Sequence, residues 1–151
     1  MEQKPALILL DTNIFVIDEI FTHDENYQEN RVFLDSAAAK ATTVYNVLEF
    51  CGIVATSTQE IELEKFFKAF HTDRGVVILY PKLYGDYLLF SVFIEQVLEH
   101  MQRGMRYGDA KILTVAEESD VTTIVTWNKR RFEGKTHIPV KTPSEFLNIS
   151  Q

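Results

Sequence analysis

Continuous apolar runs recur along the chain and are separated by longer stretches in which apolar residues recur with helical spacing. The run at residues 6–10 predicts a strand that is buried on both faces, which is typical of a parallel sheet covered by helices. The continuous apolar run at residues 76–80 and the β-branched segment at residues 121–126 predict two more strands. Shorter segments at residues 41–43 and 138–140 predict two further strands, the last of them at an edge because it contains a proline. The pattern therefore predicts an α/β fold.

Helical patterns lie between these strands. We expect the helix at residues 44–55 to be buried nearly all round, because apolar residues also lie opposite its broad apolar stripe. The aromatic-rich helix at residues 84–102 is expected to pack into the core, with a dimer face as the alternative. A last helix begins at Pro143, where Thr142 and Glu145 have capping-box spacing. Other expected helices span residues 13–20, the segment after the polar break 23–26 to about residue 40, residues 57–71, and a segment with Asp109 in its first turn.

Length and composition narrow the class of protein. A chain of 151 residues can bury a sizeable core, so we expect a single domain over residues 1–151. The net charge of −7 argues against a surface coated for nucleic acid but leaves room for a local basic patch. The single cysteine, Cys51, lies in an apolar segment, and no apolar run is long enough to span a membrane. These features predict a cytoplasmic protein that does not associate with membranes.

Asp11 ends the first apolar run and is the only charged residue between Pro5 and Ile17. Ligands of open α/β sheets bind at the carboxyl ends of the strands, so an acid at this position is a candidate site residue. The alternative is that Asp11 only caps a helix that begins at Thr12.

Two more acids interrupt apolar settings. Glu49 is the only charged residue from residue 41 to residue 59, and a buried carboxylate there would need a cation or hydrogen-bond donors. An exposed position on a partly solvated face is the alternative for Glu49. Asp109 shares the inward face of its helix with Ile112 and Leu113, although an acid in a first turn is also stabilised by the helix dipole alone.

Together, Asp11, Glu49 and Asp109 predict a metal site, because they come from three separate elements of one sheet. Like-charged carboxylates in one pocket raise one another's pKa unless a cation neutralises them. Oxygen ligands without Cys or His favour Mg²⁺ or Mn²⁺ over zinc. Because such an ion commonly coordinates phosphate, the predicted chemistry is hydrolysis of a phosphodiester bond by a metal-activated water.

The ordered combination of these motifs resembles the PIN domain family over essentially the whole chain, and most of all the single-domain ribonucleases of VapC-type toxin–antitoxin pairs. The motifs are a strand followed by Asp-Thr-Asn, a helix with a lone Glu, Gly-Asp-Ala-Lys-Ile-Leu from Gly108, Thr126-Trp127-Asn128 followed by Phe132, and Thr-Pro-Ser-Glu-Phe-Leu from Thr142. The resemblance implies a PIN-like, three-layer α/β/α fold with a central, mostly parallel sheet of about four to five strands.

The resemblance also implies roles for the acids. Asp11, Glu49 and Asp109 match the family's metal-binding residues. A fourth acid of many members falls where this chain has Asn128. An amide oxygen can ligate a metal or orient water but adds no charge, so a second metal ion would be weakly held. This departure leaves room for a site that binds RNA and cuts it poorly.

Other polar residues are expected around these acids. Asn13 and Thr126 match polar positions at the rim of the family's site. Cations that flank the acids could contact phosphates, with a solvated surface as the alternative for each of them. They are Arg103, Arg106, Lys111, Lys129, Arg130 and Arg131.

The function implied by the resemblance is that of a Mg²⁺- or Mn²⁺-dependent endoribonuclease, the toxin of a VapBC-type pair, with RNA as substrate and a homodimeric state. An antitoxin would neutralise it, most simply with a hydrophobic helix and a cation presented to the carboxylates, and the acidic balance of this chain suits a basic partner. The alternative is a non-catalytic or weakly active module that binds RNA or protein, supported by Asn128. Phosphotransfer through Asp11 fits badly, because Asn13 lies where a dehalogenase-like phosphatase needs an acid.

Overall fold

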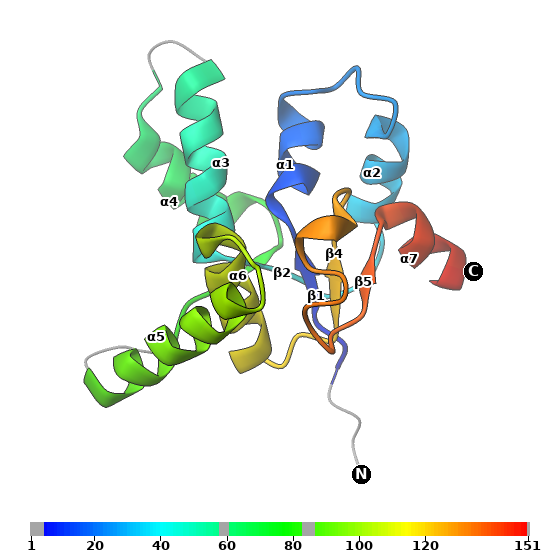
Figure 1. Cartoon of the computed structure of the whole chain (residues 1–151). Coiled ribbons are helices and arrows are strands. Elements are labelled where there is room, and N and C mark those ends of the chain that lie inside the picture. The colour runs from blue at the N-terminus through cyan, green and yellow to red at the C-terminus, as the bar shows by residue number, and fades with distance from the viewer. Residues whose placement is uncertain (1–4, 58–60, 83–86, 151) are drawn as a thin grey trace.

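The computed structural model describes residues 5–57, 61–82 and 87–150 (Figure 1). Within these residues, strands run through the middle of the molecule and helices surround them. Each neighbouring pair of strands is parallel, and the strand order in the five-stranded sheet is β3-β2-β1-β4-β5. The strands are β1 (Ile8–Leu10), β2 (Lys40–Thr43), β3 (Val77–Leu79), β4 (Thr123–Val125) and β5 (Val140–Lys141). The predicted α/β/α fold with a parallel sheet is confirmed.

The strand order reverses beside β1. The chain first moves outward from β1 through β2 to β3, and later returns to the other side of β1 with β4 and then β5. Leu10 pairs with Val125, so the residues that follow β1 and β4, Asp11 and Thr126, lie at neighbouring strand ends. A crevice forms at such a reversal, outside the carboxyl ends of the strands. The topology therefore places both residues where ligands bind in this class of fold.

Helices cover both faces of the sheet. Leu9 packs on one face with residues of α5 and α6, whereas Ile8 and Leu10 pack on the other face with residues of α1, α3 and α4. This alternation along β1 gives two apolar layers, as expected for a strand that is buried on both sides. The helices are α1 (Thr12–Glu19), α2 (Tyr27–Leu34), α3 (Val44–Ser57), α4 (Leu63–Asp73), α5 (Tyr87–Gln102), α6 (Tyr107–Glu118), the short 3₁₀ helix η1 (Lys129–Arg131) and α7 (Pro143–Ser150).

Some helix boundaries differ from the sequence prediction. The prediction of helix to about residue 40 is wrong, because α2 ends at Leu34. Ser36 donates its hydroxyl to the carbonyl of Phe33 (2.7 Å), which satisfies a carbonyl in the last turn and lets the chain turn away. The predicted helix start at Ser57 is also wrong, because Ser57 belongs to the end of α3 and α4 begins at Leu63, after Glu62. Residues 58–60 and 84–86 of two predicted helices lie outside the described residues.

Two predictions of burial also need correction. Helix α3 is not buried nearly all round, since Leu48 is 52% exposed. Helix α5 does not lie in the core as a whole: Phe93 and Val97 are buried, but Leu88 and Phe90 are 73% and 45% exposed. Among the described residues α5 packs mainly against α6, so one side of the helix is buried and the other side is largely exposed. An apolar sequence pattern cannot distinguish these two sides.

The capping box predicted for the last helix is confirmed. Thr142 and Glu145 form the capping box at the start of α7, since the amide of Glu145 donates to Thr142 Oγ1 (3.1 Å) and the amide of Thr142 to Glu145 Oε2 (3.4 Å). Of the strand predicted at residues 138–140, only Val140 lies in β5, and β5 is an edge strand as predicted.

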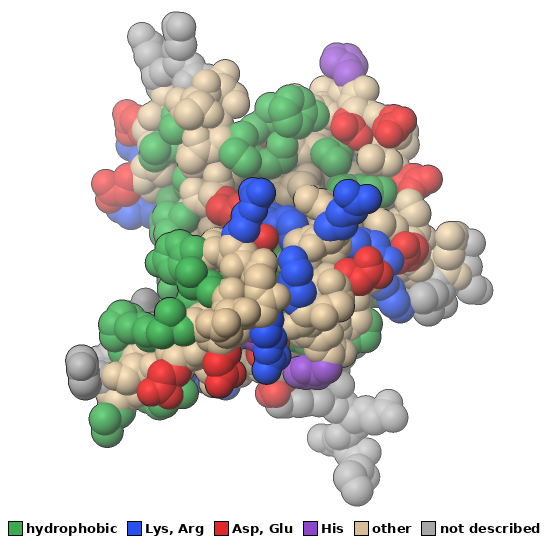
Figure 2. Space-filling model, viewed as in Figure 1, with side chains coloured by type: hydrophobic (Ala, Val, Ile, Leu, Met, Phe, Trp, Pro, Cys, Tyr) green, Lys and Arg blue, Asp and Glu red, His purple; other side chains and the backbone are tan. Residues whose placement is uncertain are grey.

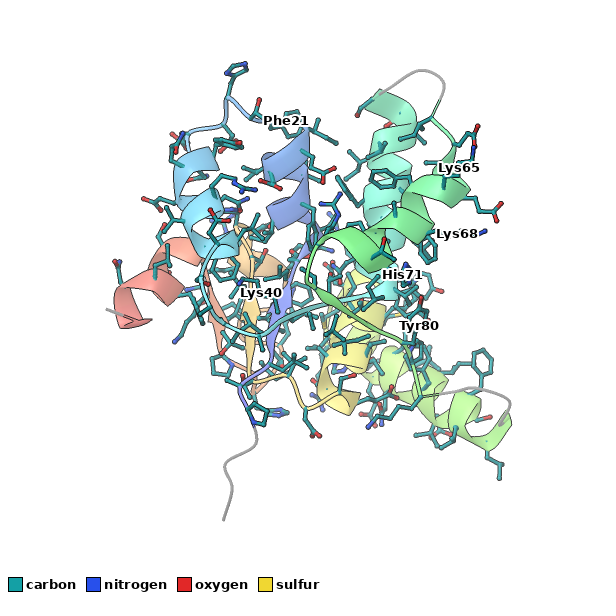
Figure 3. All side chains as sticks on the ribbon, turned by 180° about the vertical axis from the view of Figure 1, so that it is seen from behind. Phe21, Lys40, Lys65, Lys68, His71 and Tyr80 are labelled. Carbon is teal, nitrogen blue, oxygen red and sulfur yellow. The ribbon has the colours of Figure 1, made fainter. Side chains whose placement is uncertain are left out.

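On the back of the molecule, a hydrogen bond of 2.5 Å joins His71 Nε2 of α4 to Tyr80 Oη after β3 (Figure 3). No helix in the described part of the chain is long and apolar enough to cross a bilayer.

The buried position of Leu9 gives a test of the two-layer core. Leu9 is fully buried in β1, so Leu9→Ala should lower the free energy of unfolding by about 2–5 kcal/mol through lost burial and a residual cavity. Val32 of α2 is 58% exposed, so the matched change Val32→Ala should cost less than about 0.5 kcal/mol. Urea unfolding curves of both variants measure this difference. Equal losses would contradict the assignment of β1 to the centre of the core.

Candidate active site

Asp11 is held rigidly at the carboxyl end of β1. Its side chain is fully buried, and Oδ1 accepts a hydrogen bond from the amide of Thr12 (2.9 Å), so that Asp11 caps helix α1. Thr126, after β4, donates its hydroxyl to Asp11 Oδ2 (2.7 Å). Asn46 of α3 donates to Asp11 Oδ1 (3.2 Å). Asp11 is therefore a helix cap, as the alternative interpretation predicted. It also accepts hydrogen bonds from Thr126 and Asn46, which a helix cap does not need.

Asn13 and Thr126 tie the two neighbouring strand ends together. Asn13 Nδ2 donates to Thr126 Oγ1 (3.0 Å), and Asn13 Oδ1 accepts from the backbone amide of Trp127 (3.1 Å). Thr126 Oγ1 also accepts from the amide of Asn128 (3.0 Å). Asn13 and Thr126 thus lie beside Asp11, where the sequence placed them. The indole of Trp127 is fixed in turn by Asn30, through a 2.8 Å hydrogen bond from Nε1 to Oδ1.

Glu49 and Asp109 reach the same place from two helices. Glu49 projects from α3 and 38% of its side chain is exposed, so both the buried and the solvated interpretation of this residue are partly right. Asp109 lies in the first turn of α6, with 12% of its side chain exposed, on the face that also buries Ile112 and Leu113. The inward direction predicted for Asp109 is confirmed.

Arg131 joins the three acids. Its Nη1 donates to both carboxylate oxygens of Asp11 (2.7 and 2.9 Å), and its Nε donates to Asp109 Oδ1 (2.7 Å). Its Nη2 donates to the two oxygens of Glu49 (3.3 and 3.4 Å) and lies 2.5 Å from Asp109 Oδ1. The planar guanidinium offers donors in a fixed fork that suits several carboxylates at once. One guanidinium therefore marks the point at which Asp11, Glu49 and Asp109 converge.

Burial and the neighbouring charges shift the pKa values of Asp11, Glu49 and Arg131. Burial raises the pKa of Asp11 above its ordinary value, while the Arg131 guanidinium and the Thr126 hydroxyl work in the opposite direction. Burial also raises the pKa of Glu49, again against the effect of Arg131. Burial disfavours the charge on Arg131, but the attraction of Asp11 and the hydrogen bond to Asp109 are among the effects that raise the pKa of Arg131 above its ordinary value. One positive charge faces three acids, so the cluster remains electronegative.

The donor set suits a hard divalent cation, because every ligand it offers is a carboxylate oxygen. As they lie, however, no three Asp, Glu, His or Cys side chains in the described part of the chain are close enough to enclose a metal ion. The guanidinium of Arg131 lies between the three carboxylates that could do so. Asp11, Glu49 and Asp109 are therefore suitable metal ligands by residue type, but in this structure their carboxylates are arranged around the guanidinium of Arg131.

A cleft of about 650 Å³ opens in front of these groups. Asn128 is exposed and lines the cleft together with Glu49 and Asp109, so it lies near the acids, as the sequence indicated for the fourth position. Basic side chains gather at the centre of this face (Figure 2). Those that line the cleft are Arg106, Arg130, Arg131 and Lys135.

The structure does not bring the other predicted cations into this cleft. Lys111 extends over the rings of Tyr45 and Tyr107, with its Nζ 4.6 and 4.2 Å from their centroids. Lys129 pairs with Glu133 and Glu145 at the surface, 3.3 and 3.1 Å away. Arg103 lines a different pocket, beside Glu99 and His100. These pairings of Lys111 and Lys129 explain why neither side chain turns toward the acids.

Two residues of the site, Asn46 and Lys135, were not singled out from the sequence, and Arg131 was named only as one of several flanking cations. Asn46 could have been found, because it precedes Glu49 by one helical turn and is a polar residue on an otherwise apolar segment. Lys135 continues the basic run but follows a glycine turn that hides its direction. The central position of Arg131 had no sequence signal, since it appears there as one cation among six.

A second cavity, of about 450 Å³, lies between α1, α2 and α4. Its charged groups already pair with one another: Arg31 with Asp18 at 2.8 Å, and Arg74 with Glu19. Lys40, labelled in Figure 3, donates to the carbonyl oxygens of Ser36 (2.5 Å) and Ala38 (3.1 Å). This cavity therefore offers no cluster of acids comparable with that around Arg131.

The pKa shifts predict how stability depends on pH. A carboxyl whose folded-state pKa is raised contributes stability that is fully present below its unfolded-state pKa and is lost as pH rises through the raised value. As pH rises above about 4, the ordinary carboxyl pKa, the wild type should lose this contribution of Glu49 and Asp11, and Glu49→Gln should lose less. Urea unfolding at several pH values measures the slope, with Glu64→Gln on the surface of α4 as control. An unchanged or steeper slope in Glu49→Gln would disprove the assignment.

Comparisons with known proteins address the fold. No family model and no curated protein matches this sequence. Among solved structures, the chain is similar to one in a toxin–antitoxin complex from Klebsiella pneumoniae, with 20% identity over 90% of this chain and 97% of that chain and a TM-score of 0.62. It is also similar to a chain of VapBC2 from Rickettsia felis bound to a DNA fragment from their promoter, with 20% identity, coverage of 89% and 96%, and a TM-score of 0.60.

A third similar structure is VapC20 from Mycobacterium tuberculosis, described as a sarcin–ricin loop cleaving toxin, with 13% identity over 78% of this chain and 86% of that chain. Its TM-score is 0.56. At these identities the similarity concerns the fold. The chain therefore has the PIN-like α/β/α fold of VapC-type toxins, as its sequence predicts.

Proposed function

We propose that this protein is a metal-dependent endoribonuclease and the toxin of a VapBC-type toxin–antitoxin pair. The observation that carries the proposal is the convergence of three carboxylates from the end of β1, from α3 and from α6 on a single point, marked by the guanidinium of Arg131. Acids are not brought together in this way for stability, because their mutual repulsion and desolvation are unfavourable. Clustered carboxylates of this kind commonly bind a divalent cation that coordinates phosphate.

The residues of the cluster have distinct roles in this proposal. Asp11, Glu49 and Asp109 would hold Mg²⁺ or Mn²⁺, which when bound supplies an activated water and stabilises charge that develops on the phosphodiester. Thr126 holds the carboxylate of Asp11, and Asn13 holds Thr126, so the fold fixes the position of Asp11 beside the end of β4. Glu49 is the most exposed of the three acids and lies where substrate would enter.

RNA is the proposed substrate. Arg106, Arg130 and Lys135 line the cleft beside the acids, and cations in such positions bind phosphates without reading a base sequence. The site therefore combines an acidic centre with a basic margin, although the chain as a whole carries a net charge of −7. VapC20, which has a similar fold, is described as a toxin that cleaves the sarcin–ricin loop. This similarity supports RNA as the class of substrate.

An antitoxin is the proposed protein partner. Similar folds occur in complexes described as toxin–antitoxin, VapBC2 and FitAB assemblies. The exposed apolar side chains of α5 include Leu88, Phe90 and Leu98, and an apolar groove of about 450 Å³ runs between α5, α3 and α6. Such a surface suits the apolar face of a partner helix. A homodimer that uses part of this surface, and a cytoplasmic location, belong to the same proposal.

The alternative is a module of this fold that binds RNA or protein without cutting RNA. The specific observation in its favour is Asn128, which lines the cleft as an amide and adds no negative charge to the three acids. Binding would then depend on the basic margin, and replacement of an acid would leave it unchanged. Cleavage assays with acid-to-amide variants separate the two proposals.

Asp11→Asn tests catalysis. With Mg²⁺ or Mn²⁺, the purified wild type should cleave single-stranded or structured RNA, and the variant should be slower by roughly 100-fold or more, because it loses a charged ligand at the centre of the site. Asp35→Asn, which changes an exposed aspartate, should cleave at the wild-type rate, and circular dichroism should show that both variants are folded. Expression in bacteria should arrest growth for the wild type and for Asp35→Asn, but not for Asp11→Asn. RNA binding without cleavage in every protein would favour the non-catalytic module.

Asn128→Asp tests the fourth position. An added carboxylate at the edge of the cleft should strengthen the binding of divalent cations and raise cleavage, most visibly at low Mn²⁺ concentration. The matched change Asn148→Asp, at an exposed site on α7, adds the same charge away from the cleft and should have no effect. Cleavage rates over a Mn²⁺ titration measure the difference. If Asn128→Asp lowers the rate at every concentration, the fourth position does not support metal-dependent chemistry.

A further inference from the structure

Arg131 makes contacts that no other cation of the cleft shares. Its guanidinium is hydrogen-bonded to Asp11, Asp109 and Glu49 together, and 18% of the side chain is exposed. Arg130, the preceding residue in η1, is exposed and lines the cleft instead. Two adjacent arginines in one short helix thus have different environments, one between the acids and one at the margin.

The guanidinium uses the oxygens that a divalent cation would need. It contacts both oxygens of Asp11 and of Glu49, and Oδ1 of Asp109, at 2.5–3.4 Å. Mg²⁺ binds oxygen ligands at about 2.1 Å in a compact shell. The carboxylates would therefore have to close on a smaller volume than the one that the guanidinium fills. The two cations cannot occupy the site together.

We propose that Arg131 is an internal competitor of the divalent cation, which holds the three carboxylates in a latent arrangement and must leave before a metal can bind. The inference rests on the proposed metal-dependent function and names a regulation of the same site. In the latent state the positive charge of Arg131 offsets the repulsion between the acids. The protein is then stable without metal, and catalysis requires a side-chain exchange.

The backbone around Arg131 favours an exchange of the side chain alone. The amide of Arg131 donates to the carbonyl of Asn128 (3.2 Å), and the next residue, Phe132, is fully buried. These contacts fix the main chain on both sides of the guanidinium. The cleft of about 650 Å³ in front of it gives the side chain room to turn outward. There it would join Arg106 and Arg130, where like charges make the outward position unfavourable until a phosphate is present.

Metal binding in the absence of RNA tests the inference. When a binding-competent state is only about 1–10% populated, apparent affinity falls by the same fraction, so Arg131→Gln should bind Mn²⁺ about 10- to 100-fold more tightly than the wild type. Lys129→Gln removes one positive charge from the same short helix, but outside the cleft, where Lys129 pairs with Glu133 and Glu145, and it should bind Mn²⁺ as the wild type does. Isothermal titration with MnCl₂ alone measures all three affinities, and the fluorescence of Trp127, the only tryptophan, provides a second signal.

Thermal stability gives an independent measurement. Without metal, Arg131→Gln should melt roughly 5 °C or more below the wild type, because the carboxylates lose their counter-ion. Saturating Mn²⁺ should restore most of this loss in Arg131→Gln and should raise the melting temperature of the wild type much less. Arg131→Lys keeps the charge but not the fork of donors, and it should bind Mn²⁺ with an affinity between those of the wild type and Arg131→Gln. It serves as the test protein if the Gln variant does not fold.

Two outcomes would overturn the inference, and only the second of them would also overturn the proposed metal-dependent function. Equal or weaker Mn²⁺ binding in Arg131→Gln and Arg131→Lys than in the wild type would show that a metal binds without competition from Arg131, and the proposed function would remain. Absence of Mn²⁺ binding in the wild type and in every variant would overturn both the inference and the metal-dependent chemistry on which it rests.

Discussion

Repulsion between buried carboxylates is the constraint on which this structure depends. Three acids lie within reach of one guanidinium, and one of them, Asp11, is entirely removed from solvent. Such a cluster persists only if cations and hydrogen-bond donors offset the charge. Thr126 and Asn46 supply donors to Asp11, and Arg131 supplies the positive charge. The fold therefore supplies hydrogen-bond donors and a positive charge that are needed only because the three acids lie together.

The parallel sheet explains how residues that are far apart in sequence reach one place. All carboxyl ends of its strands lie at one edge, and the reversal of strand order beside β1 brings the ends of β1 and β4 together. Helices α3 and α6 then direct Glu49 and Asp109 to the same edge. The fold positions the acids through backbone topology, and the side-chain network refines their geometry.

Much of this could be predicted from the sequence, because the relevant signals are local. An uninterrupted apolar run that ends in Asp11 indicates a buried strand and its exit, and the spacing of Asp109 with Ile112 indicates an inward helix face. Arg131 has no such signal: its position depends on long-range pairing between η1 and three other elements. The same limit explains the prediction for α5, whose apolar pattern fixes a helix but not whether each side meets a partner.

The most direct test of the account is diffraction from crystals of the wild-type protein grown with and without Mn²⁺, with data collected to exploit the anomalous signal of manganese. The account predicts one strong anomalous peak ligated by Asp11, Glu49 and Asp109, with the guanidinium of Arg131 turned into the cleft, and the contacts of Arg131 with all three acids in the crystals without Mn²⁺. An absence of manganese from these carboxylates at saturating concentration, with the contacts of Arg131 unchanged, would contradict it.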